Sequence, residues 1–232
     1  KIMYKQKKIL AVILARSGSK GIRNKNIIKI KKKPLLNYTT GLIKRIKIID
    51  KAIISTDSKK YQKIAKKDSV ETPFLRSKKL SGDNVSDDIC LLDALIKCEK
   101  NYKKKFDFVV SLPPTSPLRK KEDVIKSIKK CIEKNLDSVW TISKVDSKFH
   151  PFKIMKLQKE KLTHFLKSGK KVFRRQQLSE TFIRNGNAYV VKSSYLKRTK
   201  NIISKNTESL LVHGNQISID TIDDINFAKK FL

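Results

Sequence analysis

The stretch ILAVILARSGSKGIRNKN, residues 9–26, decides the fold, because in it an apolar run passes directly into a polar loop. The seven apolar residues from Ile9 to Ala15 are typical of a strand that is covered on both faces. The loop that follows contains two glycines and four basic residues. In open α/β sheets, ligands bind outside the carboxyl ends of the strands, so this loop is a candidate ligand site.

Strand and helix signals alternate along the first part of the chain. Further strands are predicted at residues 51–57, 106–112 and 137–143, and helices at 34–49, 58–67, 85–100 and 120–134. This alternation predicts an α/β fold with a mostly parallel sheet, right-handed crossovers and helices on both faces.

The alternation stops from about residue 145 to about residue 184. A short candidate strand at 153–157 lies among polar turns there, and the strand signals return at 187–196 and 209–214. We expect one domain, residues 1–232, with a small excursion from the main sheet at about 145–184.

The net charge is +34, which raises the question of nucleic acid. However, 46 of the 55 basic residues are Lys, and they are spread along the whole chain. This pattern indicates a compositional bias and a solvated surface, and no recognition motif favours nucleic acid as a partner. The longest apolar run is far too short to span a bilayer, and no signal peptide opens the chain, so we expect a cytoplasmic protein.

The cysteines and histidines do not form metal-ligand spacings. Cys90 and Cys98 fall on one face of the helix predicted at 85–100, which indicates buried thiols in a reducing cytoplasm. Cys131 stands apart, and the three histidines are isolated from one another. Neither a structural zinc site nor a disulfide framework is therefore predicted.

The opening loop has the composition of an anion site. Gly18 and Gly21 are expected to let the backbone approach a ligand and to adopt positive φ. A phosphate-rich ligand would meet the cations Arg16, Lys20, Arg23 and Lys25. The loop matches neither the Walker A nor the G-x-G-x-x-G pattern, and a solvated turn is the alternative.

Three other polar motifs stand at or near predicted strand ends: STD (55–57), PPTSPLR (113–119) and SIDTIDD (218–224). Each leaves a structural alternative open. Asp57 is either a nucleotide contact or a turn former, and Asn185-Gly186 alone would be a hairpin turn. Asp223 and Asp224 either cap the last helix or serve a metal.

The stretch L-A-R-S-G-S-K-G-I-R-N-K-N resembles the N-terminal signature of the acylneuraminate cytidylyltransferases (CMP-sialic acid synthetases), A-R-x-x-S-K-x-[IL]-P-x-K-N. The resemblance continues in order over nearly the full chain. It includes STD (55–57), LRS (75–77), PTSPLR (114–119), HPFK (150–153), RRQQL (174–178), RNGNAY (184–189) and IDTxDD (219–224).

This resemblance implies a Rossmann-like nucleotidyltransferase fold whose excursion at about 145–184 serves dimerisation, and therefore a homodimer. It implies a reaction in which CTP and a nonulosonic acid form a CMP-sugar and pyrophosphate, with Mg²⁺ assisting. The sugar's anomeric hydroxyl would attack the α-phosphorus of CTP.

The resemblance also implies roles for individual residues. The nucleotide side would include Ala15, Arg16, Gly18, Ser19, Lys20, Lys25, Asn26, Arg76 and Ser86. The sugar side would include Thr115, Ser116, Lys153, Arg175, Gln176, Gln177 and Asn185. The expected catalytic residues are Arg16 and Lys25, which would neutralise the triphosphate, and Asp220, which would hold Mg²⁺.

Three positions depart from the family pattern. Pro113 stands where the family usually has a Gln that helps to hold the sugar, and Arg23 replaces a common Pro. Ser218 stands where the first Asp of a D-x-D metal pair belongs, which leaves Asp220 as the one carboxylate of that pair. Two alternatives stay open: a Kdo-type or other sugar-acid nucleotidyltransferase on the same fold, or a non-catalytic protein that binds nucleotide or nucleic acid.

Overall fold

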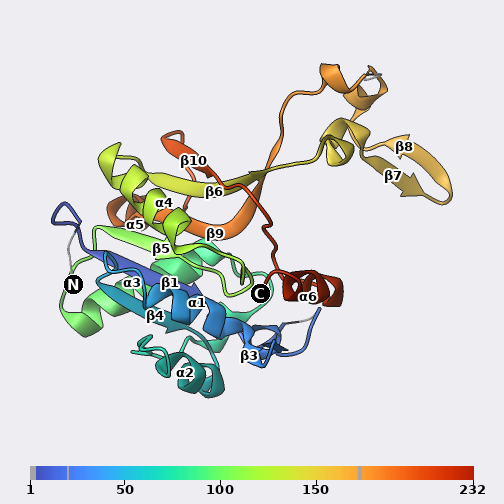
Figure 1. Cartoon of the computed structure of the whole chain (residues 1–232). Helices are drawn as coiled ribbons and strands as arrows, with labels where there is room; N and C mark the ends of the chain where they lie inside the picture. Colours follow the sequence, from blue (N-terminus) through green and yellow to red (C-terminus); the bar gives the residue numbers. More distant parts are fainter. Residues whose placement is uncertain (1–3, 20, 172–173) are drawn as a thin grey trace.

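A computed structural model of the chain describes residues 4–19, 21–171 and 174–232. Its centre is a six-stranded sheet (Figure 1). From one edge to the other, the strands are β10 (Thr207–Leu211), β6 (Ser138–Lys144), β9 (Phe182–Lys192), β5 (Phe108–Ser111), β1 (Ile9–Leu14) and β4 (Lys51–Ser55). All neighbours are parallel except β9, which runs antiparallel to both β5 and β6. The predicted mostly parallel sheet is confirmed.

Helices cover both faces of this sheet. One face packs against α1 (Leu35–Ile43), α2 (Lys59–Lys66) and α4 (Lys121–Glu133), and the other against α3 (Asp87–Tyr102) and α5 (Ser193–Thr199). Alternate residues of β1 supply both cores: Ile9, Ala11 and Ile13 face the first set of helices, and Leu10 and Val12 face the second. A strand buried on both sides explains why its sequence shows no polar alternation.

The helix predicted at residues 34–49 is shorter in the structure, where α1 ends at Ile43. The residues that follow form turns, yet Ile46 and Ile49 are buried in the same core as the helix. Their burial explains why the apolar pattern continues past the end of the helix.

The expected buried thiols are confirmed. Cys90 and Cys98 both lie on α3 and are buried, as is Cys131 on α4. Burial raises the pKa of the Cys98 thiol to about 12, so it stays protonated at neutral pH. No helix in the described part of the chain is long and apolar enough to cross a membrane.

The excursion leaves the sheet after β6 and returns at β9, so it comprises residues 145–181, and the last three residues of its predicted range belong to β9. It contains a two-stranded antiparallel hairpin, β7 (Met155–Gln158) and β8 (Lys161–His164), and short 3-10 helices at Ser147–Phe149, Pro151–Lys153, Lys167–Lys171 and Arg175–Gln177. Figure 1 shows this lobe projecting from the body of the molecule.

The C-terminal helix α6 (Ile222–Lys229) packs against the opening loop, where Ile22 belongs to the same apolar cluster. Its Ile225 and Ala228 join Ile30 and Leu35 in a third apolar cluster, beside the small hairpin of β2 (Lys29–Ile30) and β3 (Lys33–Pro34). The remaining 3-10 helices are Lys25–Ile27 and Lys78–Ser81. This packing brings residues 218–221 next to the loop that follows β1.

The start of α6 is fixed by a capping box. The Thr221 hydroxyl accepts a hydrogen bond from the Asp224 backbone N–H (3.2 Å), and the Asp224 carboxylate accepts from the Thr221 N–H (2.7 Å) and the Asp220 N–H (2.8 Å). Burial alone would raise the pKa of Asp224, but these hydrogen bonds outweigh it and hold that pKa below its ordinary value. Of the two alternatives for Asp224, the structure supports the cap.

Candidate active site

A cavity of about 870 Å³ opens at the carboxyl ends of the central strands. It is lined by the opening loop after β1, the segment before α3, residues 113–115 after β5, the middle of β9, and the segment before α6. The described lining residues are Leu14, Arg16, Ser19, Gly21, Lys25, Asn26, Arg76, Leu80, Gly82, Asp83, Val85, Asp87, Cys90, Pro113, Pro114, Thr115, Ile183, Arg184, Asn185, Gly186, Tyr189, Ser218 and Asp220. Three of the four polar motifs therefore meet at this cavity, namely the opening loop, residues 113–115 and residues 218–220, whereas none of residues 55–57 is in its described lining.

Two side chains hold the opening loop in place. The Asp57 carboxylate accepts hydrogen bonds from the Ser17 backbone N–H and hydroxyl, both at 2.8 Å. The Asn26 side-chain amide donates to the Arg16 carbonyl oxygen at 3.0 Å. Asp57 thus anchors the loop and is absent from the described lining of the cavity. Asn26 lines the cavity while it fixes the backbone beside Arg16.

The glycines of this loop differ in what they do. Gly18 does not have a positive φ, so that part of its expectation is wrong. A Cβ on it would meet open space, and its approach to a ligand stays a prediction. Asn24 has the left-handed conformation instead, with φ of 55°. Gly21 does make a close approach: a Cβ there would lie 3.3 Å from the Asp220 carbonyl oxygen. Gly21 therefore lets the opening loop pack against the segment before α6.

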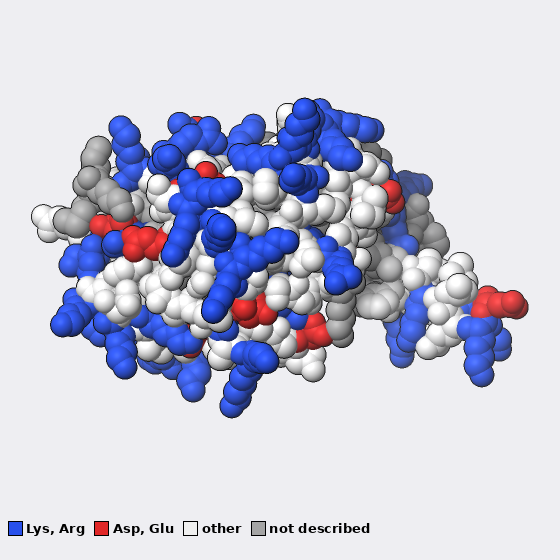
Figure 2. Space-filling model, turned by 90° about the horizontal axis from the view of Figure 1, so that it is seen from below, with Lys and Arg blue, Asp and Glu red and all other residues white. Residues whose placement is uncertain are grey.

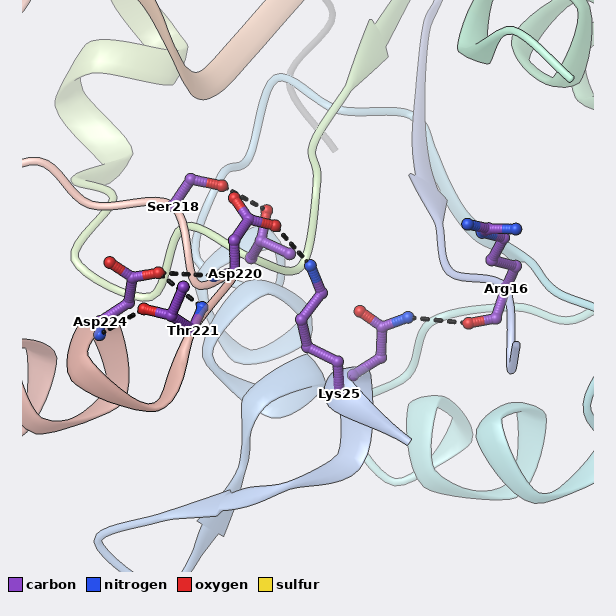
Figure 3. A network of polar contacts seen from close by, with 8 residues as sticks. Arg16, Lys25, Ser218, Asp220, Thr221 and Asp224 are labelled. Atoms are coloured by element: carbon purple, nitrogen blue, oxygen red, sulfur yellow. Dashed lines mark hydrogen bonds and ion pairs between the residues drawn. The ribbon is translucent and has the colours of Figure 1, made fainter. Parts of the chain in front are cut away.

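The two cations expected to bind phosphate are each paired with an acid. Lys25 Nζ lies 2.6 Å from Asp220 Oδ1, and Figure 3 shows the Lys25 side chain directed at that carboxylate. The Arg16 guanidinium forms an ion pair with the Asp83 carboxylate. Lys25 and Asp220 are 195 positions apart in sequence, so their pairing depends on the packing of α6.

Arg76 is a third cation in the cavity, and it is 96% buried. Its backbone N–H donates to the Thr56 carbonyl oxygen at 2.8 Å, which ties its segment to the end of β4. Its Nε atom is buried and has no hydrogen-bond partner in the described part of the chain. A buried guanidinium N–H without an acceptor fits a site that receives an anion from outside.

The segment 113–116 supports the cavity from beneath. Thr115 lines it and accepts a hydrogen bond at 3.3 Å from the Ser218 hydroxyl. Ser116 lies behind the lining: it is buried, and its hydroxyl donates to the Gly186 carbonyl oxygen at 3.0 Å. The Ile219 N–H donates to the Thr115 carbonyl oxygen at 2.8 Å, which joins this segment to the one before α6.

Asn185 and Gly186 lie inside β9 and do not form a hairpin turn. Gly186 has φ of 71°, next to a register shift between β6 and β9, and a Cβ on it would lie 2.8 Å from the Ser116 hydroxyl oxygen. The Asn185 amide donates to the Ser143 hydroxyl at 3.0 Å and its oxygen accepts from the Asn187 N–H at 3.1 Å. Asn185 therefore lines the cavity with a side chain that is already held in place.

The structure adds residues that sequence reasoning missed. The buried Arg119 guanidinium donates to Thr39 Oγ1 (2.9 Å), to the Gly186 carbonyl oxygen (3.0 Å) and to the Pro113 carbonyl oxygen. Burial lowers its pKa to about 9, so it remains charged at neutral pH. An Arg at the end of a proline-rich motif in a Lys-dominated chain is the signal that could have identified it. Arg184 stands in the motif RNGNAY but was given no role, and Asp83 stands in none of the quoted motifs.

Several predicted residues lie outside this cavity. Ala15 is buried behind it, and Ser86 caps α3 by accepting a hydrogen bond from the Ile89 N–H at 3.4 Å. Lys153, Gln176, Gln177 and the backbone of Arg175 belong to the excursion. Lys20 lies outside the described residues.

A second cavity of about 330 Å³ adjoins the first and shares Asp87, Arg184 and Tyr189 with it. Its other described lining residues are Ser86, Asp88, Leu91, Ser111, Trp140, Asn201, Ile202 and Ile203. The Asp88 carboxylate accepts a hydrogen bond from the Ile202 N–H at 3.3 Å, and burial raises its pKa. The combined lining of the two cavities mixes charged with apolar side chains.

The charge of the cavity differs from that of the protein surface. Its described lining holds four cations (Arg16, Lys25, Arg76, Arg184) and three carboxylates (Asp83, Asp87, Asp220). On the face shown in Figure 2, Lys and Arg side chains are scattered over the whole surface and do not form one stripe. That face fits the interpretation of a solvated lysine-rich surface.

The chain matches known proteins over nearly its whole length. The family model described as Cytidylyltransferase matches residues 10–231. The chain is 31% identical over 220 residues to the post-translational flagellin modification protein B of Campylobacter coli, covering 94% of this chain and 92% of that protein. It is 30% identical over 221 residues to the CMP-N,N'-diacetyllegionaminic acid synthase of Campylobacter jejuni, with the same coverages.

The fold is also that of a solved cytidylyltransferase. The structure of CMP:2-keto-3-deoxy-manno-octonic acid synthetase complexed with CTP superposes with a TM-score of 0.73 at 14% identity, covering 97% of this chain and 98% of that one. At this identity the likeness concerns the fold alone. Because the family model and the two Campylobacter relatives match nearly the whole chain, this chain belongs to the cytidylyltransferase family, among proteins that resemble the CMP-sialic acid synthetases.

Proposed function

We propose that this cytidylyltransferase forms a CMP-sugar and pyrophosphate from CTP and a nonulosonic, sialic-like acid. The observation that carries the proposal is the meeting of Arg16, Lys25 and the buried Arg76 in one cavity at the carboxyl ends of the parallel strands. Relatives over nearly the whole length bear the names of CMP-diacetyllegionaminic acid synthase and pseudaminic acid cytidylyltransferase. A reaction that consumes CTP requires the cellular nucleotide pool, so the cytoplasm remains the expected location.

The triphosphate would lie against the opening loop. CTP carries about four negative charges near neutral pH, and the guanidinium groups of Arg16 and Arg76 suit phosphate oxygens because they present several N–H donors in one plane. Lys25 Nζ would supply a compact charge near the departing pyrophosphate. Ser19 and Asn26 line the same part of the cavity.

The sugar acid would occupy the side of the cavity towards β9. The Arg184 guanidinium, shared by both cavities, is suited to a sugar carboxylate, and Thr115 offers a hydroxyl. Trp140, Ile202 and Ile203 give the second cavity an apolar wall that suits the acyl group of an acylated sugar. We propose that these contacts hold the sugar in place of the Gln that the family usually has at the position of Pro113.

In the proposed reaction, the anomeric hydroxyl oxygen forms a bond to the α-phosphorus of CTP. The bond from that phosphorus to the bridging oxygen breaks, pyrophosphate leaves with the electron pair, and the hydroxyl proton is released. Arg16 and Lys25 stabilise the charge that develops on the leaving group. Fixed cations of this kind contribute about 3–4 kcal/mol each to transition-state stabilisation.

Mg²⁺ is the proposed cofactor, and Asp220 is its proposed protein ligand. In the described residues no group of three or more His, Cys, Asp or Glu could hold a metal. The Asp220 side chain is 66% exposed, lines the cavity and pairs with Lys25 through Oδ1, whereas the Asp224 carboxylate is occupied by the helix cap. One carboxylate with the neighbouring Ser218 hydroxyl fits a cation that the nucleotide's phosphates hold in large part. Mg²⁺ would neutralise phosphate charge in that position.

A homodimer is proposed from the excursion. Its Phe149, Leu157, Leu162 and Phe165 are 62–69% exposed, which is unusual for large apolar side chains on one small lobe. The same lobe carries Lys153, Gln176 and Gln177, which lie outside the cavity of their own chain. A second copy of the chain covering this lobe would bury the apolar side chains.

The direct test is pyrophosphate release with each nucleotide and a panel of nonulosonic acids. We expect release with CTP and at least one acylated nonulosonic acid, and little with UTP, ATP or GTP. Equal use of UTP would assign the chain to another nucleotidyltransferase branch. Kdo as the preferred acceptor would favour the Kdo-type alternative, and nucleotide binding without release would favour the non-catalytic one.

Arg16→Ala and Lys25→Ala are each expected to lower turnover by about 10²- to 10³-fold, because each removes a charge that stabilises the departing pyrophosphate. Steady-state kinetics and circular dichroism check activity and folding together. Lys60→Ala, an exposed lysine on α2, is the matched control and should retain full turnover. Near-wild-type activity in both site variants would remove the opening loop from the triphosphate site.

Asp220→Asn should abolish turnover, and Ser218→Asp should lower the Mg²⁺ concentration that gives half-maximal rate, because a second carboxylate strengthens the cation site. Both are measured by Mg²⁺ titration at saturating CTP. Full activity of Asp220→Asn would transfer the ligand role to another acid, with Asp223 the next to test. An unchanged Mg²⁺ dependence in Ser218→Asp would show that position 218 does not limit metal binding.

Light scattering at assay concentration is expected to give the mass of a dimer, 53.4 kDa as twice the 26.7 kDa of one chain. Leu157→Glu with Leu162→Glu should shift the mass towards the monomer, because charges would be buried at the interface. Ile96→Glu is the matched control, since Ile96 is 51% exposed on α3, outside the excursion. A strictly monomeric wild-type protein would contradict the proposal.

A further inference from the structure

Asp83 holds the Arg16 guanidinium inside the nucleotide cavity. It follows Gly82 in the segment between the 3-10 helix Lys78–Ser81 and α3, and it lines the cavity together with Gly82 and Val85. Its ion pair with Arg16 therefore crosses from one wall of the cavity to the opening loop. The sequence motifs gave Asp83 no role.

A carboxylate and a phosphate present similar oxygens to a guanidinium. Both accept charge-assisted hydrogen bonds from its N–H groups, so Asp83 occupies Arg16 in the same way that a phosphate would. The second pair repeats the arrangement, because Asp220 accepts from Lys25 at 2.6 Å. In the structure, therefore, two of the three cations proposed to meet the triphosphate, Arg16 and Lys25, are each paired with a carboxylate of the chain itself.

We propose that Asp83 is an internal substitute for phosphate, which positions Arg16 before nucleotide binds and is displaced by the incoming triphosphate. This proposal rests on the proposed function, since it takes Arg16 as a triphosphate ligand. Asp83 is a positioning residue in this role: it acts through Arg16, and it lowers the apparent affinity for any phosphate chain that must compete with it.

The segment that carries Asp83 is held in a way that permits displacement. The 3-10 helix Lys78–Ser81 buries none of its residues, and Gly82, Asp83 and Asn84 are exposed. The Cys90 thiol donates to the Leu80 carbonyl oxygen at 3.3 Å, and the Ser81 hydroxyl donates to the Ser77 carbonyl oxygen at 3.0 Å. The side chains of Arg16 and Asp83 are 34% and 37% exposed, so water can solvate both groups when the ion pair separates.

The test is the affinity of Asp83→Asn for CTP and for inorganic tripolyphosphate, measured by calorimetry without Mg²⁺. Removing the competing carboxylate should tighten both by about fivefold, which is about 1 kcal/mol. Asp87→Asn is the matched control, because Asp87 lines the same cavity and the variant removes the same charge. Asp83→Glu keeps the carboxylate and should return towards the wild-type affinity.

A double-mutant cycle separates competition at Arg16 from a general change of charge. In the Arg16→Ala background, Asp83→Asn should increase the affinity for tripolyphosphate no more than Asp87→Asn does, because the guanidinium that Asp83 holds is then absent. The proposal would be overturned if Asp83→Asn and Asp87→Asn increased the affinity equally. It would also be overturned if the larger increase in Asp83→Asn persisted without Arg16.

The same titrations distinguish this proposal from the proposed function. Wild-type protein that binds CTP and releases pyrophosphate, with no gain of affinity in Asp83→Asn, overturns the role of Asp83 alone. A gain for tripolyphosphate in protein that releases no pyrophosphate with any sugar acid supports the role of Asp83 and overturns the proposed function.

Discussion

The hydrogen bonds of the buried Arg119 guanidinium hold together the elements that support the cavity at residues 113–115. It reaches α1 through Thr39, the segment after β5 through the Pro113 carbonyl oxygen, and β9 through the Gly186 carbonyl oxygen. Burying a charge costs desolvation energy, and hydrogen bonds from its donors offset part of that cost. The three contacts offset part of that cost and fix three separate elements relative to one another. The segment 113–115, which lines the cavity, has its position from this arrangement.

The local parts of the fold could be predicted from the sequence. The run from Ile9 to Ala15 predicted a strand covered on both faces, and β1 does place alternate residues in two cores. The end of α1 could not be predicted, because Ile46 and Ile49 are buried from turns and continue the helical pattern. A helical spacing of apolar residues therefore indicates which residues are buried, but it does not show where the helical backbone ends.

The sequence indicated where in the fold the candidate site lies, but it did not show which of its residues contact one another. Motifs at strand ends indicated the correct edge of the sheet, since parallel strands bring their carboxyl ends together. The partners of Arg16 and Lys25 could not be found in this way, because Asp83 and Asp220 lie 67 and 195 positions from them. Likewise, the motif around Asp57 left two roles open, and only its contacts with Ser17 show that it anchors the loop.

The joining of the opening loop to the segment before α6 determines when the cavity can form. Gly21 packs against the Asp220 carbonyl oxygen, and Ile219 pairs with Thr115, so residues from early and late in the chain close one wall. Contacts of such sequence separation form slowly, because the loop between them must first be ordered. During synthesis on the ribosome, β1, β4 and β5 emerge well before Asp220, and they can already pair with one another. Part of the core can therefore form while the chain still lacks the residues that complete the nucleotide pocket.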